Sequence, residues 1–281
     1  MTISTSRRSC DSPVGPADGP GHPGQPGQPG QPGKPGQPLD TAAAVIRIPG
    51  TPVLAYFGSA ADGDMRGLGA ELLERRAVAA GAGERLRLPS VVVSARQVHG
   101  ASVHIVDGAG REQEPPVEAD ALVCDRPAVA VGVLTADCAP IALGSPQGVF
   151  AAVHAGWRGL VAGVIEAAVG SMRDLGAAEV SAVLGACIHP CCYEFSHTDL
   201  MAAEKAFGAG LAATSRNGRP ALDLPRGVEV ALARAGATLV GAESDCSCCA
   251  EGWFSYRARR DSFRQGVLVW REVPAGAGGG E

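Results

Sequence analysis

Strand-like segments rich in β-branched residues fill the first half of the chain and are the strongest constraint on its fold. They cover residues 43–57, 91–106, 119–143 and 148–154. We expect 119–143 to form two strands joined by a turn at Asp125-Arg126-Pro127. Because all of these segments precede the first clear helical pattern, the fold must be organised around a substantial sheet.

Helical spacing of apolar residues becomes clear after residue 160. The stretch 160–175 predicts an amphipathic helix that ends near Gly176. Ser196-His197-Thr198-Asp199 fits a capping box, and it introduces a second helix with plausible buried positions at Leu200, Met201, Phe207 and Leu211. Another short helix should follow Pro225, and residues 253–273 predict an arginine-rich loop that enters a final strand. Strands first and helices interleaved later predict an α+β fold, with a mixed sheet flanked by helices in a single domain.

The two ends of the chain differ from its middle. Residues 21–38 repeat Gly-x-Pro, a composition that buries too little apolar surface to offset the entropy of ordering, so we predict a disordered tail over residues 1–40. We expect the catalytic domain to cover residues 41–273 and a flexible tail to cover 274–281.

Charge and cysteine content exclude several functional classes. The net charge is −5 and no run of Lys and Arg forms a basic footprint, which argues against nucleic-acid binding and for a small-molecule substrate. No uninterrupted apolar segment approaches the roughly 18 residues of a membrane span. The nine cysteines are odd in number and several are adjacent, which suits reduced thiols in the cytoplasm. The oligomeric state stays open.

Three short motifs follow apolar strands and carry residues that can bind a metal. They are Gln97-Val98-His99-Gly100, Thr135-Ala136-Asp137-Cys138 and the stretch from His154 to Gly159, HAGWRG. Two imidazoles and one thiolate, from His99, Cys138 and His154, form a set typical of catalytic zinc with one open position, and the sulfur also tolerates copper. By spacing alone, each residue has an equally good interpretation as a packed core residue.

The glycines of HAGWRG add to the metal hypothesis. Gly156 and Gly159 permit close backbone approach, and they flank Trp157 and Arg158, which would place an aromatic ring and a cation beside the metal.

The remaining cysteines form two groups. Cys187, Cys191 and Cys192 surround His189, and Cys246, Cys248 and Cys249 precede Trp253. Either group could bind a second metal, or its members could be small buried hydrophobes. His104 lies in a strand pattern and is interpreted as structural.

The motifs also resemble a known family. RQVHG, ADALV, TADCAP, AAVHAGWRG, GACIHPCCYE and FSYR occur in the order found in the YfiH-like family, described as polyphenol oxidases and later as purine nucleoside phosphorylases. The resemblance covers roughly residues 90–271. It implies a single-domain fold with one metal bound by His99, Cys138 and His154, phosphorolysis of adenosine and inosine with phosphate, and deamination of adenosine.

The chain departs from this family near its front end. Relatives carry a Thr-x-Arg-x-Gly-Gly stretch and an Asn-Leu pair where this chain has Ala55-Tyr56-Phe57-Gly58-Ser59, followed by a helix-like ELLERR. The arginine expected there is missing. Because the family's segment lines the pocket, this departure bears on the substrate.

A nucleoside phosphorolysis needs cations for phosphate and hydrogen-bond donors for the purine. The candidate phosphate partners are Arg158, Arg257, Arg260 and Arg264, of which the last three could instead belong to a solvated loop. Trp157 is a further candidate for substrate binding. Asp137 could orient a ligand, shuttle a proton or cap a turn, and Gln97 could bind substrate or support His99.

Three other functions fit the same residues. In a cysteine hydrolase, Cys138 would be the nucleophile and His154 or His99 its base, acting on an amide of a cell-wall precursor. A copper-bound polyphenol oxidase is the second alternative, although five histidines outside the tail are few for a multicopper cluster. An inactive metal-binding protein is the third.

Overall fold

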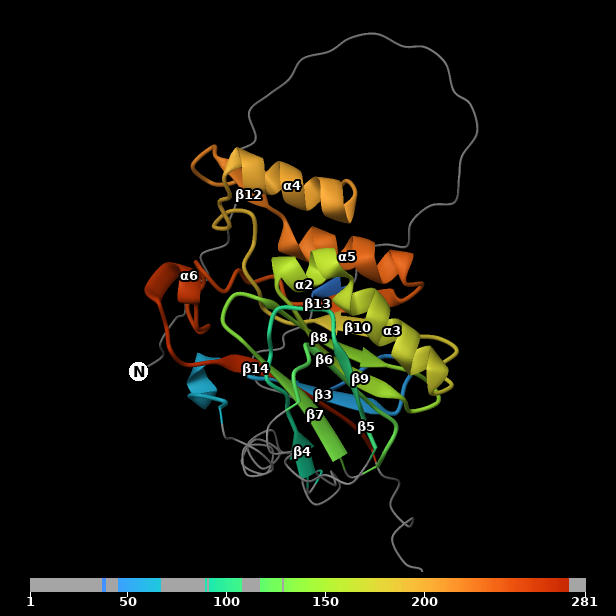
Figure 1. Cartoon of the computed structure of the whole chain (residues 1–281). Helices are drawn as coiled ribbons and strands as arrows, with labels where there is room; N and C mark the ends of the chain where they lie inside the picture. Colours follow the sequence, from blue (N-terminus) through green and yellow to red (C-terminus); the bar gives the residue numbers. More distant parts are fainter. Residues whose placement is uncertain are drawn as a thin grey trace, which may run out of the picture.

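Two packed sheets with helices on one side form the core of the computed structural model (Figure 1). The structure describes residues 37–38, 45–66, 89, 91–107, 117–127 and 129–272. The larger sheet has the order β1 (Gln37–Pro38), β13 (Thr238–Ala242), β10 (Ser181–Leu184), β8 (Ala139–Gly144), β9 (Phe150–Ala155), β6 (Ala121–Cys124) and β5 (Val103–Val106). The pairs β10–β8, β8–β9 and β9–β6 are antiparallel and the outer pairs are parallel, so this sheet is mixed.

A five-stranded sheet packs against the larger one. Its order is β2 (Val45–Arg47), β3 (Val53–Phe57), β14 (Gln265–Arg271), β7 (Val129–Thr135) and β4 (Val91–Val93). Val131, Val267 and Val269 of this sheet share a buried cluster with Leu122 and Phe150 of the larger sheet. Every residue of β9 is buried because both faces of its sheet are covered, which explains why the strand has no polar face.

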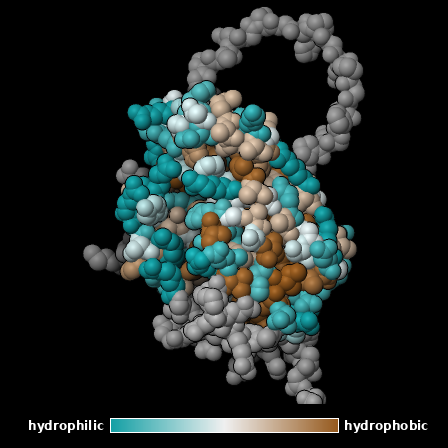
Figure 2. Space-filling view, viewed as in Figure 1, coloured by the Kyte–Doolittle hydropathy of each residue, from teal (hydrophilic) through white to brown (hydrophobic). Residues whose placement is uncertain are grey.

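Helices cover the other face of the larger sheet. They are α2 (Trp157–Ala162), α3 (Val164–Asp174), α4 (His197–Phe207) and α5 (Leu224–Arg234), with the short α6 (Tyr256–Arg259) and the 3₁₀ helix η1 (Ala60–Asp62) elsewhere. The hairpin of β11 (Ala212–Thr214) and β12 (Pro220–Leu222) lies beside α4. Hydrophobic residues gather at the surface near β5, the edge strand, where Ile105 is exposed (Figure 2).

The predicted α+β fold with a mixed sheet and flanking helices is confirmed, and the structure divides the elements more finely. The segment 119–143 contains the three strands β6, β7 and β8 where we expected two. The helix expected over 160–175 starts earlier and is two helices, because Gly163 adopts a left-handed φ of 87° between α2 and α3. Ser196 caps α4 as predicted, through the amide of Asp199. Met201 is exposed where we expected burial.

The chain ends lie mostly outside the described residues. Within the predicted tail, residues 37–38 pair with β13 as β1, and the rest of residues 1–40, the ELLERR stretch and residues 274–281 are outside the described part. In the described ranges, no helix has both the length and the apolar character needed to cross a membrane.

Candidate metal centre and pocket

Sheet pairing brings the three predicted ligand residues together. β8 and β9 are antiparallel neighbours in which Pro140 pairs with His154, so Cys138, just before β8, lies beside the end of β9. His99 comes from the loop between β4 and β5. One donor atom from each of His99, Cys138 and His154 lies within 4.8 Å of the others, which is close enough for all three to contact one ion.

A buried carboxylate that the sequence interpretation missed organises two of these ligands. Asp120 Oδ1 accepts a hydrogen bond from His154 Nδ1 at 2.7 Å. The same carboxylate accepts from the backbone amides of His99 at 2.9 Å and Gly100 at 2.7 Å. These bonds hold His99 at a φ of 61°, which a residue with a side chain seldom adopts. Since a carboxylate only accepts, His154 carries a proton on Nδ1, and its Nε2 is the ring nitrogen left to face Cys138 and His99.

The environment keeps Asp120 ionised. Burial raises the pKa of its carboxyl, but the hydrogen bonds from His154 and from the amides of Gly100 and His99 outweigh burial and bring the pKa below its usual value. The signal for this residue was present in the sequence as an acid at the start of the apolar strand ADALV. An acid at such a position is costly unless it is bonded on several sides.

Cys138 and His154 shift each other's pKa through a hydrogen bond between their side chains. Burial raises the pKa of the Cys138 thiol, but hydrogen bonds with His154 and His99 lower it to about 6. Burial lowers the pKa of His154, but hydrogen bonds with Asp120 and Cys138 raise it to about 9. The pair therefore favours thiolate and imidazolium near neutral pH. The thiolate is the form of cysteine that binds metal or attacks a substrate.

Two glycines of HAGWRG make room for this arrangement. A Cβ on Gly156 would lie 3.0 Å from both Cys138 Sγ and His99 Cδ2. A Cβ on Gly159 would lie 2.8 Å from the carbonyl oxygen of Gly100. The close backbone approach expected from the motif is present, and it packs the start of α2 against the loop that carries His99.

The trio opens on a pocket of about 530 Å³. Its walls come from the segment after η1, the loop after β4, the end of β7 with the β7–β8 loop, the end of β9, the loop after β10, and α6 with the segment before β14. The lining residues are Arg66, Ala95, Gln97, His99, Leu134, Thr135, Ala136, Asp137, Cys138, His154, Tyr193, Tyr256, Arg257 and Arg264. Its volume falls within the usual range for small-molecule sites.

Besides Cys138 and His154 of the trio, four of the predicted substrate and catalytic residues line this pocket, and three do not. Gln97, Asp137, Arg257 and Arg264 are on its wall. Trp157 instead packs edge-on against Phe195, with the guanidinium of Arg158 4.5 Å above its ring. The guanidinium of Arg260 stacks over the ring of Tyr256, 4.8 Å from its centroid.

Gln97 and Asp137 use their side chains to hold neighbouring loops. The Gln97 amide donates to the carbonyl of Leu134 at 2.7 Å and accepts from its backbone N–H at 2.8 Å, so it extends the pairing of β7. Asp137, at a φ of 92°, accepts from the Ser247 hydroxyl at 2.9 Å and from the backbone N–H of Arg257 at 2.6 Å. Both residues therefore fix the pocket wall.

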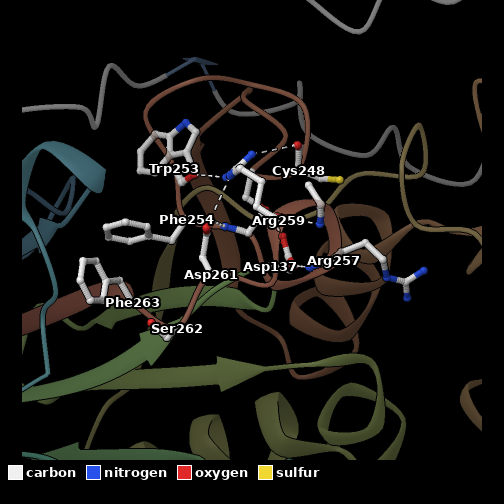
Figure 3. Close-up of polar contacts among 12 residues, drawn as sticks. Asp137, Cys248, Trp253, Phe254, Arg257, Arg259, Asp261, Ser262 and Phe263 are labelled. Atoms are coloured by element: carbon white, nitrogen blue, oxygen red, sulfur yellow. Dashed lines mark hydrogen bonds and ion pairs between the residues drawn. The ribbon is translucent and has the colours of Figure 1, made fainter.

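The loop that carries Arg257 is tied down by its own charged groups. Arg259 donates to the carbonyls of Trp253 and Cys248 and to the carboxylate of Asp261, whereas the side chain of Arg257 points away from this network (Figure 3). The Arg257 guanidinium lies 4.9 Å above the ring of Tyr193 and donates to the carbonyl of Glu194.

The structure adds pocket residues to which the sequence interpretation gave no role. Arg66 lines the pocket from the segment after β3, where we expected the family's arginine to be missing. Its guanidinium pairs with Asp64, whose carboxylate also accepts from the amide of Arg264. Thr135 is buried on the wall, and its hydroxyl has no hydrogen-bond partner among the described residues.

Comparisons with known proteins show which proteins this chain resembles. A family described as multi-copper polyphenol oxidoreductase laccase matches residues 71–272. A protein named purine nucleoside phosphorylase from Streptomyces griseus is 41% identical over 65% of this chain and 75% of its own length. One of the same name from Corynebacterium glutamicum is 31% identical over 65% of this chain and 75% of its own.

Solved structures share the fold. YlmD from Geobacillus stearothermophilus has a TM-score of 0.63 at 23% identity, covering 80% of this chain and 94% of its own. YfiH from Bacillus licheniformis has a TM-score of 0.60 at 24% identity, covering 78% of this chain and 92% of its own. From the family match, the identity to these relatives and the shared fold, the chain belongs to the YfiH-like family of laccase-type polyphenol oxidoreductase proteins.

Proposed function

We propose that this protein is a zinc-dependent purine nucleoside phosphorylase that converts adenosine or inosine and phosphate into the free base and ribose 1-phosphate. One observation carries the proposal: the His99, Cys138 and His154 side chains face a pocket whose wall also holds Arg66, Arg257 and other cationic and aromatic groups. Relatives of this chain that carry the name purine nucleoside phosphorylase support the choice of reaction.

The donor set fits zinc. Two imidazole nitrogens and one thiolate, with donor atoms within 4.8 Å, are a usual three-ligand zinc set, and the carboxylate of Asp120 orients His154 as outer-sphere carboxylates commonly do. Copper is the alternative because thiolate and imidazole also suit it. When bound, the ion would act as a Lewis acid toward a substrate atom or a water molecule.

The chain's own residues supply the other requirements of phosphorolysis. Arg66, Arg257 and Arg264 line the pocket, where their positive charge would attract phosphate and hold it for attack on the ribose. Tyr193 and Tyr256 offer aromatic surface for a purine. The buried Thr135 hydroxyl is positioned to bond a polar group of a bound substrate, which would satisfy it.

Deamination of adenosine belongs to the same proposal. It requires an activated water at C6 of the purine, which the metal site would supply without phosphate. The two reactions therefore differ in whether they require phosphate. Adenosine that yields inosine in phosphate-free buffer reports deamination, whereas release of adenine that depends on phosphate reports phosphorolysis.

A cysteine hydrolase that edits a cell-wall amide is the second candidate, and one observation favours it. The Cys138 thiol has a pKa of about 6 because of its hydrogen bonds to His154 and His99, despite burial, so the pair resembles an activated nucleophile and its base. A metal chelator distinguishes the candidates, since it would stop a zinc enzyme and leave a metal-free nucleophile active. Oxidation of a phenol by the copper-loaded protein tests the third candidate.

The direct experiment incubates the purified chain with inosine and phosphate and measures hypoxanthine and ribose 1-phosphate. The proposal expects both products in equal amounts, only with phosphate, and only while the chain retains a stoichiometric metal. Hypoxanthine without a phosphate requirement would identify a hydrolase. No turnover of any nucleoside by fully metallated protein would overturn the proposal in favour of a metal-binding protein without this activity.

A further inference from the structure

A second group of sulfur atoms lies outside the trio. Cys191 and Cys192 are in the loop between β10 and α4, and Cys246 and Cys249 are in the loop after β13. Their four Sγ atoms lie within 4.8 Å of one another. Each pair comes from a different cysteine group of the sequence, and the chain folds so that Cys187 and Cys248 are left out of the set.

The spacing of the sulfurs fits a single tetrahedral ion. The Sγ atom of Cys191 is 3.7 Å from that of Cys192 and 3.8 Å from that of Cys249. Four thiolates at about 2.3 Å from zinc in a regular tetrahedron lie about 3.8 Å apart. A polynuclear iron–sulfur cluster would spread its cysteines further, because iron and sulfide ions lie between them. The sulfurs also stand well beyond the bonding distance of a disulfide, about 2.05 Å.

The surroundings of the group supply what a tetrathiolate site needs. The backbone N–H of His189 donates to Cys246 Sγ at 3.3 Å, and such N–H···S bonds orient and stabilise ligand thiolates. The guanidinium of Arg216 contacts Cys192 Sγ and donates to the carbonyl of Cys191, which places a positive charge beside a site that would carry excess negative charge. Cys246 is buried, and the other three are half-buried.

We propose that Cys191, Cys192, Cys246 and Cys249 bind one zinc ion in a closed, structural site. The four-sulfur donor set leaves no position for water or substrate, so the ion would link the two loops and take no part in the reaction. The proposal concerns a different site from the trio and does not depend on the reaction run there.

The four cysteines adjoin residues that form or support the pocket wall. Tyr193 directly follows Cys192 and lines the pocket. Ser247 directly follows Cys246 and donates to Asp137, which adjoins Cys138. A metal that joins these two loops would therefore hold the pocket wall next to the trio.

Zinc content of the full chain tests the site. Each protein is purified with reductant and equilibrated with buffered zinc, and bound zinc per chain is measured by mass spectrometry of the metal. Cys249→Ser should lose one equivalent relative to the wild type. Cys248→Ser is the matched control, because Cys248 lies in the same loop and its thiol contacts that of Cys192, yet it is not one of the four cysteines whose sulfurs lie together. It should keep all its zinc.

A second pair of measurements guards against a variant that fails to fold. Cys249→His keeps four donors, so it should retain the ion while its cobalt form shows a weaker thiolate-to-metal absorption than wild type. His99→Ala should lose a different equivalent of zinc. If the trio binds no zinc, the wild type should hold one equivalent, and that zinc should remain in His99→Ala and be lost in Cys249→Ser. This result also supports the site. Equal zinc in wild type and Cys249→Ser, or iron in place of zinc, would overturn the proposal.

Discussion

Replacing Asp120 by asparagine preserves the volume of a fully buried side chain while removing its charge and one of its acceptor oxygens. Asp120 Oδ1 accepts from His154 and from the amide of His99, and Oδ2 accepts from the amides of Gly100 at 2.7 Å and Val98 at 3.2 Å. At the position of Oδ2, the new NH₂ group faces two amide donors that it cannot bond. At the position of Oδ1, it faces the amide of His99 and the His154 ring, which can accept from it only by moving its proton to Nε2. One or two donors then lose their acceptor.

The magnitude follows from these contacts. Each buried donor left without a partner costs about 1–3 kcal/mol, so the loss of one or two donors in Asp120→Asn should lower the free energy of unfolding of the metal-free protein by about 1–6 kcal/mol. Loss of the carboxylate that orients a ligand histidine typically weakens metal affinity by about 10–100-fold, which we expect for zinc here. The first effect acts on the loop that carries His99, and the second acts through His154.

Two assays separate the effects. Urea denaturation of metal-free protein gives the unfolding free energy, and competition with a chelator gives the zinc affinity under conditions where circular dichroism shows both proteins folded. Asp125→Asn is the control, because this acid lies just after the same strand but is partly exposed and, among the described residues, forms an ion pair with Arg126 alone. It should change stability by less than about 0.5 kcal/mol. Unchanged zinc affinity and stability in Asp120→Asn would refute the assigned role of this carboxylate.

Three further predictions concern the trio and the pocket. Gly156→Ala should fold but bind zinc at least about tenfold more weakly, measured by the same competition, because its Cβ would lie 3.0 Å from Cys138 Sγ and His99 Cδ2. In metal-free protein, alkylation of Cys138 followed by peptide mass spectrometry should rise as the pH passes about 6 and then level off, because hydrogen bonds from His154 and His99 outweigh burial and lower its pKa from 9.0. A rise that continues to pH 9 would contradict this. Arg257→Ala should raise the KM for phosphate about tenfold with full metal content, while Arg260→Ala, outside the pocket, should not.

Local patterns predicted the elements better than their boundaries. β-branched runs identified the strands because buried strands of this kind need such residues on both faces, and the Ser196 cap located the start of α4. The break between α2 and α3 was missed because apolar spacing continues across Gly163, whose left-handed φ is decided by packing. Similarly, periodicity alone could not show that Met201 is exposed.

The candidate site shows the same division. The sequence singled out His99, Cys138 and His154 as residues able to bind metal at strand ends, and the family resemblance, not their spacing, favoured a metal site over a packed core. Only the tertiary structure revealed Asp120, because a carboxylate 34 residues before His154 in the chain becomes its partner only when β6 pairs with β9. In the same way, Arg66 reaches the pocket only through chain folding.

The sequence by itself determined the fold class, the strand-rich core and the metal-competent trio, because these depend on residue type and on spacing along short segments. The tertiary structure decided how that trio is oriented, which arginines share its pocket, and which four cysteines meet. Those properties depend on contacts between segments far apart in the chain, whose pairing is set by the two sheets and their buried faces. Composition alone carries no record of such contacts.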